Sequence, residues 1–147
     1  METKLLRGEQ EKDLQEAARL LHAGETVAFP TETVYGLGAN ALDADAVRKI
    51  YQAKGRPSDN PLIVHIYDKK QLNTLTEHVS ETAQQLMDAF WPGPLTLIFQ
   101  KKQDAIPDCV TGGLDTVAVR MPNHPVALRL LQLADLPIAA PSANLSG

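Results

Sequence analysis

The chain has 147 residues, of which 44% are hydrophobic and 22% charged, so it is long enough to form one globular domain with a buried core. The net charge of −4 argues against a dedicated nucleic-acid-binding protein, whose domain would usually be basic. The single cysteine, Cys109, excludes an intrachain disulfide and a Cys-x-x-Cys metal site.

The first half of the chain predicts a helix, a strand and a loop in succession. Apolar residues recur at helical spacing over residues 9–23, and Gly24 ends this helix. A short buried strand follows at residues 26–30 and ends at a proline. Residues 31–38 are polar and contain two glycines, so we expect a loop there.

A second helix is predicted after this loop. Asp43 can cap its N-terminus, and its apolar residues form one inward-facing stripe. Lys54 falls on the same stripe at the last turn, and Gly55 ends the helix. The later elements are predicted as strands at residues 61–66, 95–99, 116–121 and 138–140, and as helices at residues 80–90 and 125–133.

These elements indicate an α/β (α+β) fold with a mixed sheet. Several strands are continuously apolar, which is typical of a sheet that is covered on both faces. The chain ends in a turn-like segment directly after the strand at residues 138–140, so that strand lacks a following partner. We therefore expect residues 1–147 to be one domain that is truncated at its C-terminal end.

Two basic residues flank Gly55. Helix termination alone can explain them, because cations near a helix C-terminus complement the helix dipole. An anion site is the alternative, since Lys54 faces inward while Arg56 and Asn60 lie in a loop with two prolines. An ammonium group and a planar guanidinium in a rigid loop suit a phosphate.

Two polar residues interrupt apolar strands. His65 lies in the strand at residues 61–66, where a lone histidine is more often a satisfied core residue than a ligand. Arg120 lies in the strand at residues 116–121, and an arginine buried there needs an anionic partner. That partner is either a carboxylate of the protein or a carboxylate of a substrate.

The segment at residues 141–147, PSANLSG, follows the last predicted strand. Its small hydroxyl and amide residues would let backbone amides approach a phosphate or a ribose, although a simple turn explains the composition equally well. Residues 36–41 match G-x-G-x-x-A formally, but they lack the preceding strand and the later acidic residue of a dinucleotide site.

Metal and membrane signals are absent from the sequence. The four histidines are scattered without metal-ligand spacing, so we expect no protein metal site. No signal core follows the first methionine, and no apolar run has the length of a membrane span. We expect a cytoplasmic protein without membrane contact.

Several segments together are far more specific than any one of them. In chain order they are FPTETVYGL (29–37), KGR (54–56), NPL (60–62), FWPGPLT (90–96), VRMP (119–122) and PSANLSG (141–147). This pattern resembles the YrdC-like threonylcarbamoyl-AMP synthase family from about residue 10 onward. The resemblance implies a twisted, open sheet flanked by helices, with a large, positively charged concave cavity.

The resemblance also implies an activity. Members of the family join L-threonine, bicarbonate and ATP, with Mg²⁺, into L-threonylcarbamoyladenylate and release pyrophosphate. The product supplies downstream tRNA threonylcarbamoyl-transfer proteins, which modify an adenosine beside the anticodon. Direct contact with tRNA or double-stranded RNA is a further expectation.

By position, the resemblance assigns two groups of residues. The threonine-binding group is Thr33, His65, Arg120 and the backbone near Ala140. The ATP-binding group is Lys54, Arg56, Asn60, Thr116, Ser142 and Asn144. No covalent nucleophile and no protein ligand for a metal are implied, and the electrostatic contribution to catalysis falls to Lys54, Arg56 and Arg120.

Two alternatives remain open at the level of sequence. One is a carbamoyl-adenylate-forming domain of the hydrogenase maturation type, and the other is a module that binds double-stranded RNA or tRNA. The family's catalytic domain continues after the segment at residues 141–147. We therefore expect residues 1–147 alone to bind ATP weakly and to turn over poorly.

Overall fold

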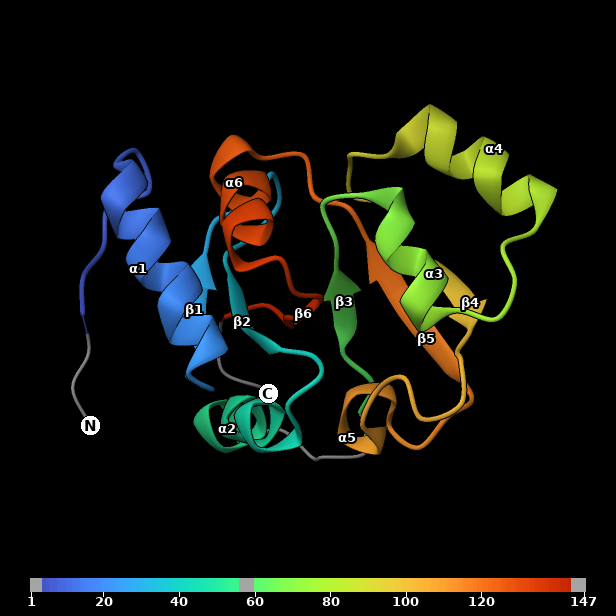
Figure 1. The fold of residues 1–147 in the computed structure, drawn as a ribbon, viewed down its shortest axis with the longest axis horizontal. Coiled ribbons are helices and arrows are strands. Elements are labelled where there is room, and N and C mark those ends of the chain that lie inside the picture. The colour runs from blue at the N-terminus through green and yellow to red at the C-terminus, as the bar shows by residue number, and fades with distance from the viewer. Residues whose placement is uncertain (1–3, 56–59, 144–147) are drawn as a thin grey trace.

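The computed structural model describes residues 4–55 and 60–143. In this part of the chain six strands form one mixed sheet in the order β1-β2-β6-β3-β5-β4 (Figure 1). The strands are β1 Val27–Phe29, β2 Gly36–Asn40, β3 Ile63–His65, β4 Leu97–Gln100, β5 Thr116–Arg120 and β6 Ile138–Ala139. The helices are α1 Glu11–His22, α2 Ala44–Lys54, the 3₁₀ helix η1 Lys69–Gln71, α3 Leu72–Leu75, α4 Glu81–Phe90, α5 Asp108–Thr111 and α6 Pro125–Ala134.

The strands β3 and β5 pair in parallel, and the other strand pairs are antiparallel. In this parallel register His65 lies opposite Arg120. On its other side β3 pairs with β6, where His65 lies opposite Ile138. Three neighbouring strands therefore bring their side chains together at one level of the sheet.

Two buried clusters cover the two faces of the sheet. One face packs against α1 and α6, and its cluster includes Phe29 and Ile138. The opposite face packs against α2, and its cluster includes Val64, Val119 and Ala139. Because successive strand residues alternate between faces, His65 and Arg120 point to the face of α1 and α6. The expectation of a sheet covered on both faces is confirmed for these central strands.

The predicted helix boundaries follow from capping chemistry. The Asp43 side chain accepts hydrogen bonds from the backbone N–H groups of Asp45 and Ala46, which caps α2. Gly55 ends α2 in the left-handed conformation, with φ of 64°. The inward direction predicted for Lys54 is confirmed, because this residue is only 4% exposed.

The prediction of a loop throughout residues 31–38 was wrong, because β2 begins at Gly36. Its glycines serve close packing. A Cβ atom on Gly38 would lie 2.7 Å from Phe29 Cε1 and 2.8 Å from Ile138 Cγ2. Glycine here is therefore a strand residue that lets β2 lie under the Phe29 ring, and not a turn signal. The short helices η1, α3 and α5 were not predicted.

Candidate active site

Arg120 is the centre of a polar cluster on the α1 and α6 face of the sheet. Its Nε donates a hydrogen bond to the Gly93 carbonyl oxygen at 3.1 Å, and its Nη1 donates to Thr33 Oγ1 at 3.4 Å. Its Nη2 forms an ion pair with Glu32. The anionic partner predicted for Arg120 is therefore a carboxylate of the protein in this structure.

Glu32 was missed by the sequence analysis. It lies in the loop between β1 and β2, and its second carboxylate oxygen accepts a hydrogen bond from the Asn123 backbone N–H at 2.8 Å. The available signal was modest: Glu32 is the only acidic residue in the loop after strand β1. Arg120 lies 88 residues away, so the pairing could not be read from local spacing.

The loop that carries Glu32 is braced by its own threonines. Thr31 Oγ1 donates to the Val34 carbonyl oxygen at 2.6 Å and lies 3.1 Å from Thr33 Oγ1. Thr33 itself is exposed. Because Thr33 is exposed and Arg120 is buried, the cluster meets the protein surface at Thr33.

His65 is buried beside Arg120, with 3% of its surface exposed. Its ring packs edge-on against Phe29, with centroids 6.0 Å apart, and its Nδ1 lies 3.2 Å from the Ile63 carbonyl oxygen. Burial, and secondly the positive charge of Arg120, lower the pKa of His65 to about 4. His65 is therefore neutral at neutral pH and does not place a second positive charge next to Arg120.

Ala140 lies next to this cluster, toward the opposite end of β3. Its backbone N–H donates to the Ile63 carbonyl oxygen at 2.9 Å, and the residue is buried. The structure thus brings Thr33, His65 and Arg120 together, and Ala140 directly follows β6, two residues after Ile138, the partner of His65.

A second polar contact joins the end of α2 to the segment after β6. Lys54 Nζ donates to the Ser142 carbonyl oxygen at 2.6 Å, and Ser142 also bridges to Gly36 at the start of β2. Asn60 lies close to α2, because its carbonyl oxygen accepts a hydrogen bond from the Tyr51 hydroxyl at 2.7 Å. Lys54, Asn60 and Ser142 are therefore all placed around the C-terminal half of α2.

Of the other members of the predicted ATP group, the structure describes only Thr116. Thr116 pairs with Gln100 at the beginning of β5. It lies roughly 13 Å along that strand from Arg120, given the rise of an extended chain. Arg56 and Asn144 fall outside the described residues. The predicted positively charged cavity remains a prediction.

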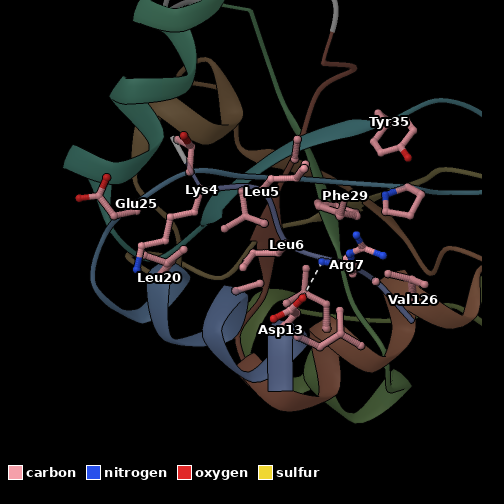
Figure 2. Close-up of a pocket in the computed structure, with 18 of the residues that line it drawn as sticks. Lys4, Leu5, Leu6, Arg7, Asp13, Leu20, Glu25, Phe29, Tyr35 and Val126 are labelled. Carbon is pink, nitrogen blue, oxygen red and sulfur yellow. Dashed lines mark hydrogen bonds between the residues drawn. The ribbon is translucent and has the colours of Figure 1, made fainter. Parts of the chain in front are cut away.

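A hollow of about 960 Å³ lies elsewhere, between residues 4–9, α1 and β1 (Figure 2). Leu5, Leu6 and Phe29 are among the apolar residues that line it, and the Arg7 backbone N–H donates to Asp13 at 2.8 Å there. None of the predicted site residues within the described part of the chain lines this hollow. We place the candidate site at Arg120, where buried charged and hydrogen-bonding groups converge.

Other reactive groups are few in the described structure. Burial raises the pKa of the Cys109 thiol, so this thiol is protonated at neutral pH and is a poor nucleophile. Across residues 4–55 and 60–143, no three His, Cys, Asp or Glu side chains gather as a metal site. Within those same ranges, no helix has both the length and the apolar character that crossing a membrane requires.

Known proteins resemble this chain over most of its length. The threonylcarbamoyl-AMP synthase of Bacillus subtilis (strain 168) is 65% identical over 134 residues, which are 91% of this chain and 39% of the relative. The threonylcarbamoyl-AMP synthase of Pseudomonas putida (strain KT2440) is 40% identical over 134 residues, or 91% of this chain and 71% of the relative. This chain thus spans 39% of the length of the Bacillus subtilis relative and 71% of the length of the Pseudomonas putida relative.

The fold comparison agrees. The crystal structure of Pyrococcus abyssi Sua5 complexed with L-threonine superposes with a TM-score of 0.91 and 57% identity, over 94% of this chain and 40% of that one. The predicted α/β fold with a mixed sheet is therefore confirmed. Residues 19–147 also match the family model Sua5–YciO–YrdC, whose description is telomere recombination. The chain belongs to the Sua5–YciO–YrdC family.

Proposed function

We propose that this chain carries part of the active site of an L-threonylcarbamoyladenylate synthase. Such an enzyme is a nucleotidyltransferase that joins L-threonine, bicarbonate and ATP and releases pyrophosphate. The observation that carries the proposal is the meeting of Thr33, His65 and Arg120 on one face of the sheet. The names of the relatives support the reaction, and the threonine complex of the Pyrococcus abyssi protein supports the substrate.

The cluster around Arg120 is proposed to bind L-threonine. The Arg120 guanidinium suits the substrate carboxylate, because its planar fork matches two carboxylate oxygens. The exposed Thr33 hydroxyl is within reach of the same ligand, and neutral His65 adds no competing charge. The buried backbone near Ala140 forms the proposed floor on the β6 side.

The region around the end of α2 is proposed to bind ATP. The described contact between Lys54 and Ser142 supports this assignment, since it joins two of the proposed ATP residues. The full proposed set is Lys54, Arg56, Asn60, Thr116, Ser142 and Asn144. Lys54 and Arg56 would face the triphosphate, where cations stabilise the negative charge of phosphoryl transfer.

The proposed chemistry requires no protein nucleophile. The threonine amine captures bicarbonate as a carbamate, with loss of water. A carbamate oxygen then attacks the α-phosphorus, and the bond from that phosphorus to the bridging oxygen breaks to release pyrophosphate. The protein contributes alignment of the reactants and electrostatic stabilisation.

Mg²⁺ is the cation that the triphosphate would bring to such a site. The described residues offer no cluster of protein ligands for it, so we expect phosphate oxygens to hold it and derive no step through it. We further propose that the reaction takes place in the cytoplasm. Its product would pass to tRNA threonylcarbamoyl-transfer proteins, with tRNA as a further contact.

The test supplies ATP, Mg²⁺, bicarbonate and L-threonine and measures pyrophosphate and the adenylate, the latter by mass spectrometry. The Bacillus subtilis relative is the positive control. Turnover is expected to require threonine. Turnover without threonine but with carbamoyl phosphate would favour the hydrogenase maturation type, and salt-dependent RNA binding that ignores ATP and threonine would favour the RNA-binding alternative.

A further inference from the structure

The ion pair between Glu32 and Arg120 has two independently anchored partners. Arg120 Nε is held by the Gly93 carbonyl oxygen at 3.1 Å, a contact that does not involve Nη2. Glu32 Oε2 is held by the Asn123 N–H at 2.8 Å, whereas its Oε1 contacts Arg120 Nη2. A ligand that enters between Oε1 and Nη2 would leave both anchors in place.

The charges of this cluster sum to zero. Arg120 contributes one positive charge and Glu32 one negative charge, while His65 is neutral because burial and Arg120 lower its pKa to about 4. A free amino acid at neutral pH is also neutral overall, since it carries one carboxylate and one ammonium group. A simple carboxylic acid instead brings one uncompensated negative charge.

We propose that Glu32 and Arg120 exchange partners when the substrate binds, so that Glu32 selects zwitterionic amino acids over acids without an amine. In the bound state Arg120 Nη2 faces the substrate carboxylate and Glu32 Oε1 faces the ammonium group. This inference rests on the proposed function, because it assumes that Arg120 binds the amino acid. Glu32 is thereby a specificity-determining residue.

An acid without an amine meets two costs at the same place. It competes with Glu32 for the guanidinium, and once bound it lies next to the displaced carboxylate, where like charges repel. Discrimination thus arises from an unfavourable contact with the wrong ligand as well as a favourable one with the right ligand. If Glu32 only tethered its loop to the segment after β5, loss of the Glu32 carboxylate would lower the affinity for both kinds of ligand equally.

The test compares two probes by isothermal titration calorimetry: L-threonine and 3-hydroxybutyrate, which is threonine without its amine. Glu32→Gln keeps the size of the side chain and removes its charge. It is expected to lower the affinity for L-threonine by about tenfold, which is the effect of losing a charge-assisted hydrogen bond. The same substitution should leave the affinity for 3-hydroxybutyrate unchanged or increase it.

The matched control is Glu11→Gln, which makes the same chemical change in the ion pair that Glu11 forms with Arg129 between α1 and α6. It should alter the affinity for neither probe. Thermal unfolding checks that each variant is folded. Should Glu32→Gln fail to fold, Glu32→Asp replaces it. Because Glu32→Asp retains the charge, it should bind L-threonine less tightly and still prefer it to 3-hydroxybutyrate.

The outcomes separate this inference from the function on which it rests. If the unsubstituted chain binds L-threonine and Glu32→Gln lowers the affinity for both probes equally, the inference is overturned and the proposed function stands. Loss of the threonine preference in Glu32→Asp would overturn it in the same way. If the unsubstituted chain binds no L-threonine, the threonine assignment and this inference are both overturned.

Discussion

Arg120 and Lys54 are both buried cations, but the protein holds them differently. Arg120 is 8% exposed and lies at the end of strand β5, where its described partners are a backbone carbonyl, a hydroxyl and a carboxylate. Lys54 is 4% exposed and lies at the end of a helix, where its Nζ reaches the Ser142 carbonyl oxygen. One position is fixed by strand register and the other by a helix terminus.

This difference matches the two ligands proposed for them. A rigid guanidinium with a carboxylate beside it suits a small zwitterion, whose charges must be matched at two points. An ammonium group on a long flexible stem acts as a point charge and suits the many equivalent oxygens of a triphosphate. We therefore expect substitutions at the two cations to have separable effects on stability and on binding.

The largest expected effect is that of Arg120→Met. It removes the cation of a partly buried ion pair together with the hydrogen bonds to Gly93 and Thr33, and we expect it to lower the free energy of unfolding by about 3 kcal/mol. This value is at the low end of the usual range because the Glu32 side chain keeps 23% of its exposure. Urea unfolding measures the change. Affinity for L-threonine should fall more than affinity for ATP, and an equal fall in both would contradict the division between the two cations.

The next largest effect concerns the neutral histidine beside Arg120. The pKa of His65 is about 4 in the folded chain and about 6.5 when unfolded, so acid protonates the unfolded state first. Stability should therefore fall as the pH drops from 6.5 toward 4, by about 2 kcal/mol at pH 5. Urea unfolding at pH 7.5 and pH 5 should show a smaller acid effect in His65→Gln.

The control for this acid effect is His78→Gln, since His78 is exposed and lies just before α4. It should keep the acid sensitivity of the unsubstituted chain. If His65→Gln loses as much stability between pH 7.5 and pH 5 as the control does, protonation of His65 is not the cause of the acid effect. His65 would then not be held neutral by burial beside Arg120.

Lys54→Met is expected to act on nucleotide binding. Methionine retains the apolar stem of lysine, and loss of the ammonium group should weaken ATP binding by about tenfold, or about 1.4 kcal/mol. L-Threonine binding should change little. Titration with each ligand in turn tests this, and a threonine defect as large as the ATP defect would remove the separation between the two sites.

The smallest effect is predicted for Gly55→Ala, next to Lys54. Gly55 has φ of 64° and nothing within 4 Å of an added Cβ, so backbone strain is the only penalty. We expect a loss of about 1 kcal/mol of stability in urea unfolding. Gly113, with φ of 80° and equally open space, provides the matched variant Gly113→Ala, which should cost a similar amount. A much larger loss at Gly55 alone would indicate a second constraint on the end of α2.

Local chemistry made much of this fold predictable. The cap at Asp43 and the left-handed Gly55 are sequence-local, so both ends of α2 and the inward direction of Lys54 followed from the residues. The need of Arg120 for an anion was equally predictable, because its strand is apolar. These features depend on neighbours within a few positions.

The rest depends on contacts between distant segments. The glycines of β2 were interpreted as a loop, because nothing near Gly38 reveals the Phe29 ring and the Ile138 side chain that pack against it. The sequence does not decide whether the partner of Arg120 is a protein or a substrate carboxylate, since Glu32 comes from a loop 88 residues away. The roles of Arg56 and Asn144 stay predictions, because these residues lie outside the described structure.

The long reach of these contacts has a consequence for folding. The Glu32 contact to Arg120 and the Lys54 contact to Ser142 each close 88 residues of chain. Contacts of such high sequence separation form late, because a long segment must be ordered before they contribute stability. During synthesis, α1, β1 and α2 are complete well before β5 leaves the ribosome. Both proposed binding regions therefore arise in the last stage of folding, and binding of either ligand reports a chain whose central strands have already paired.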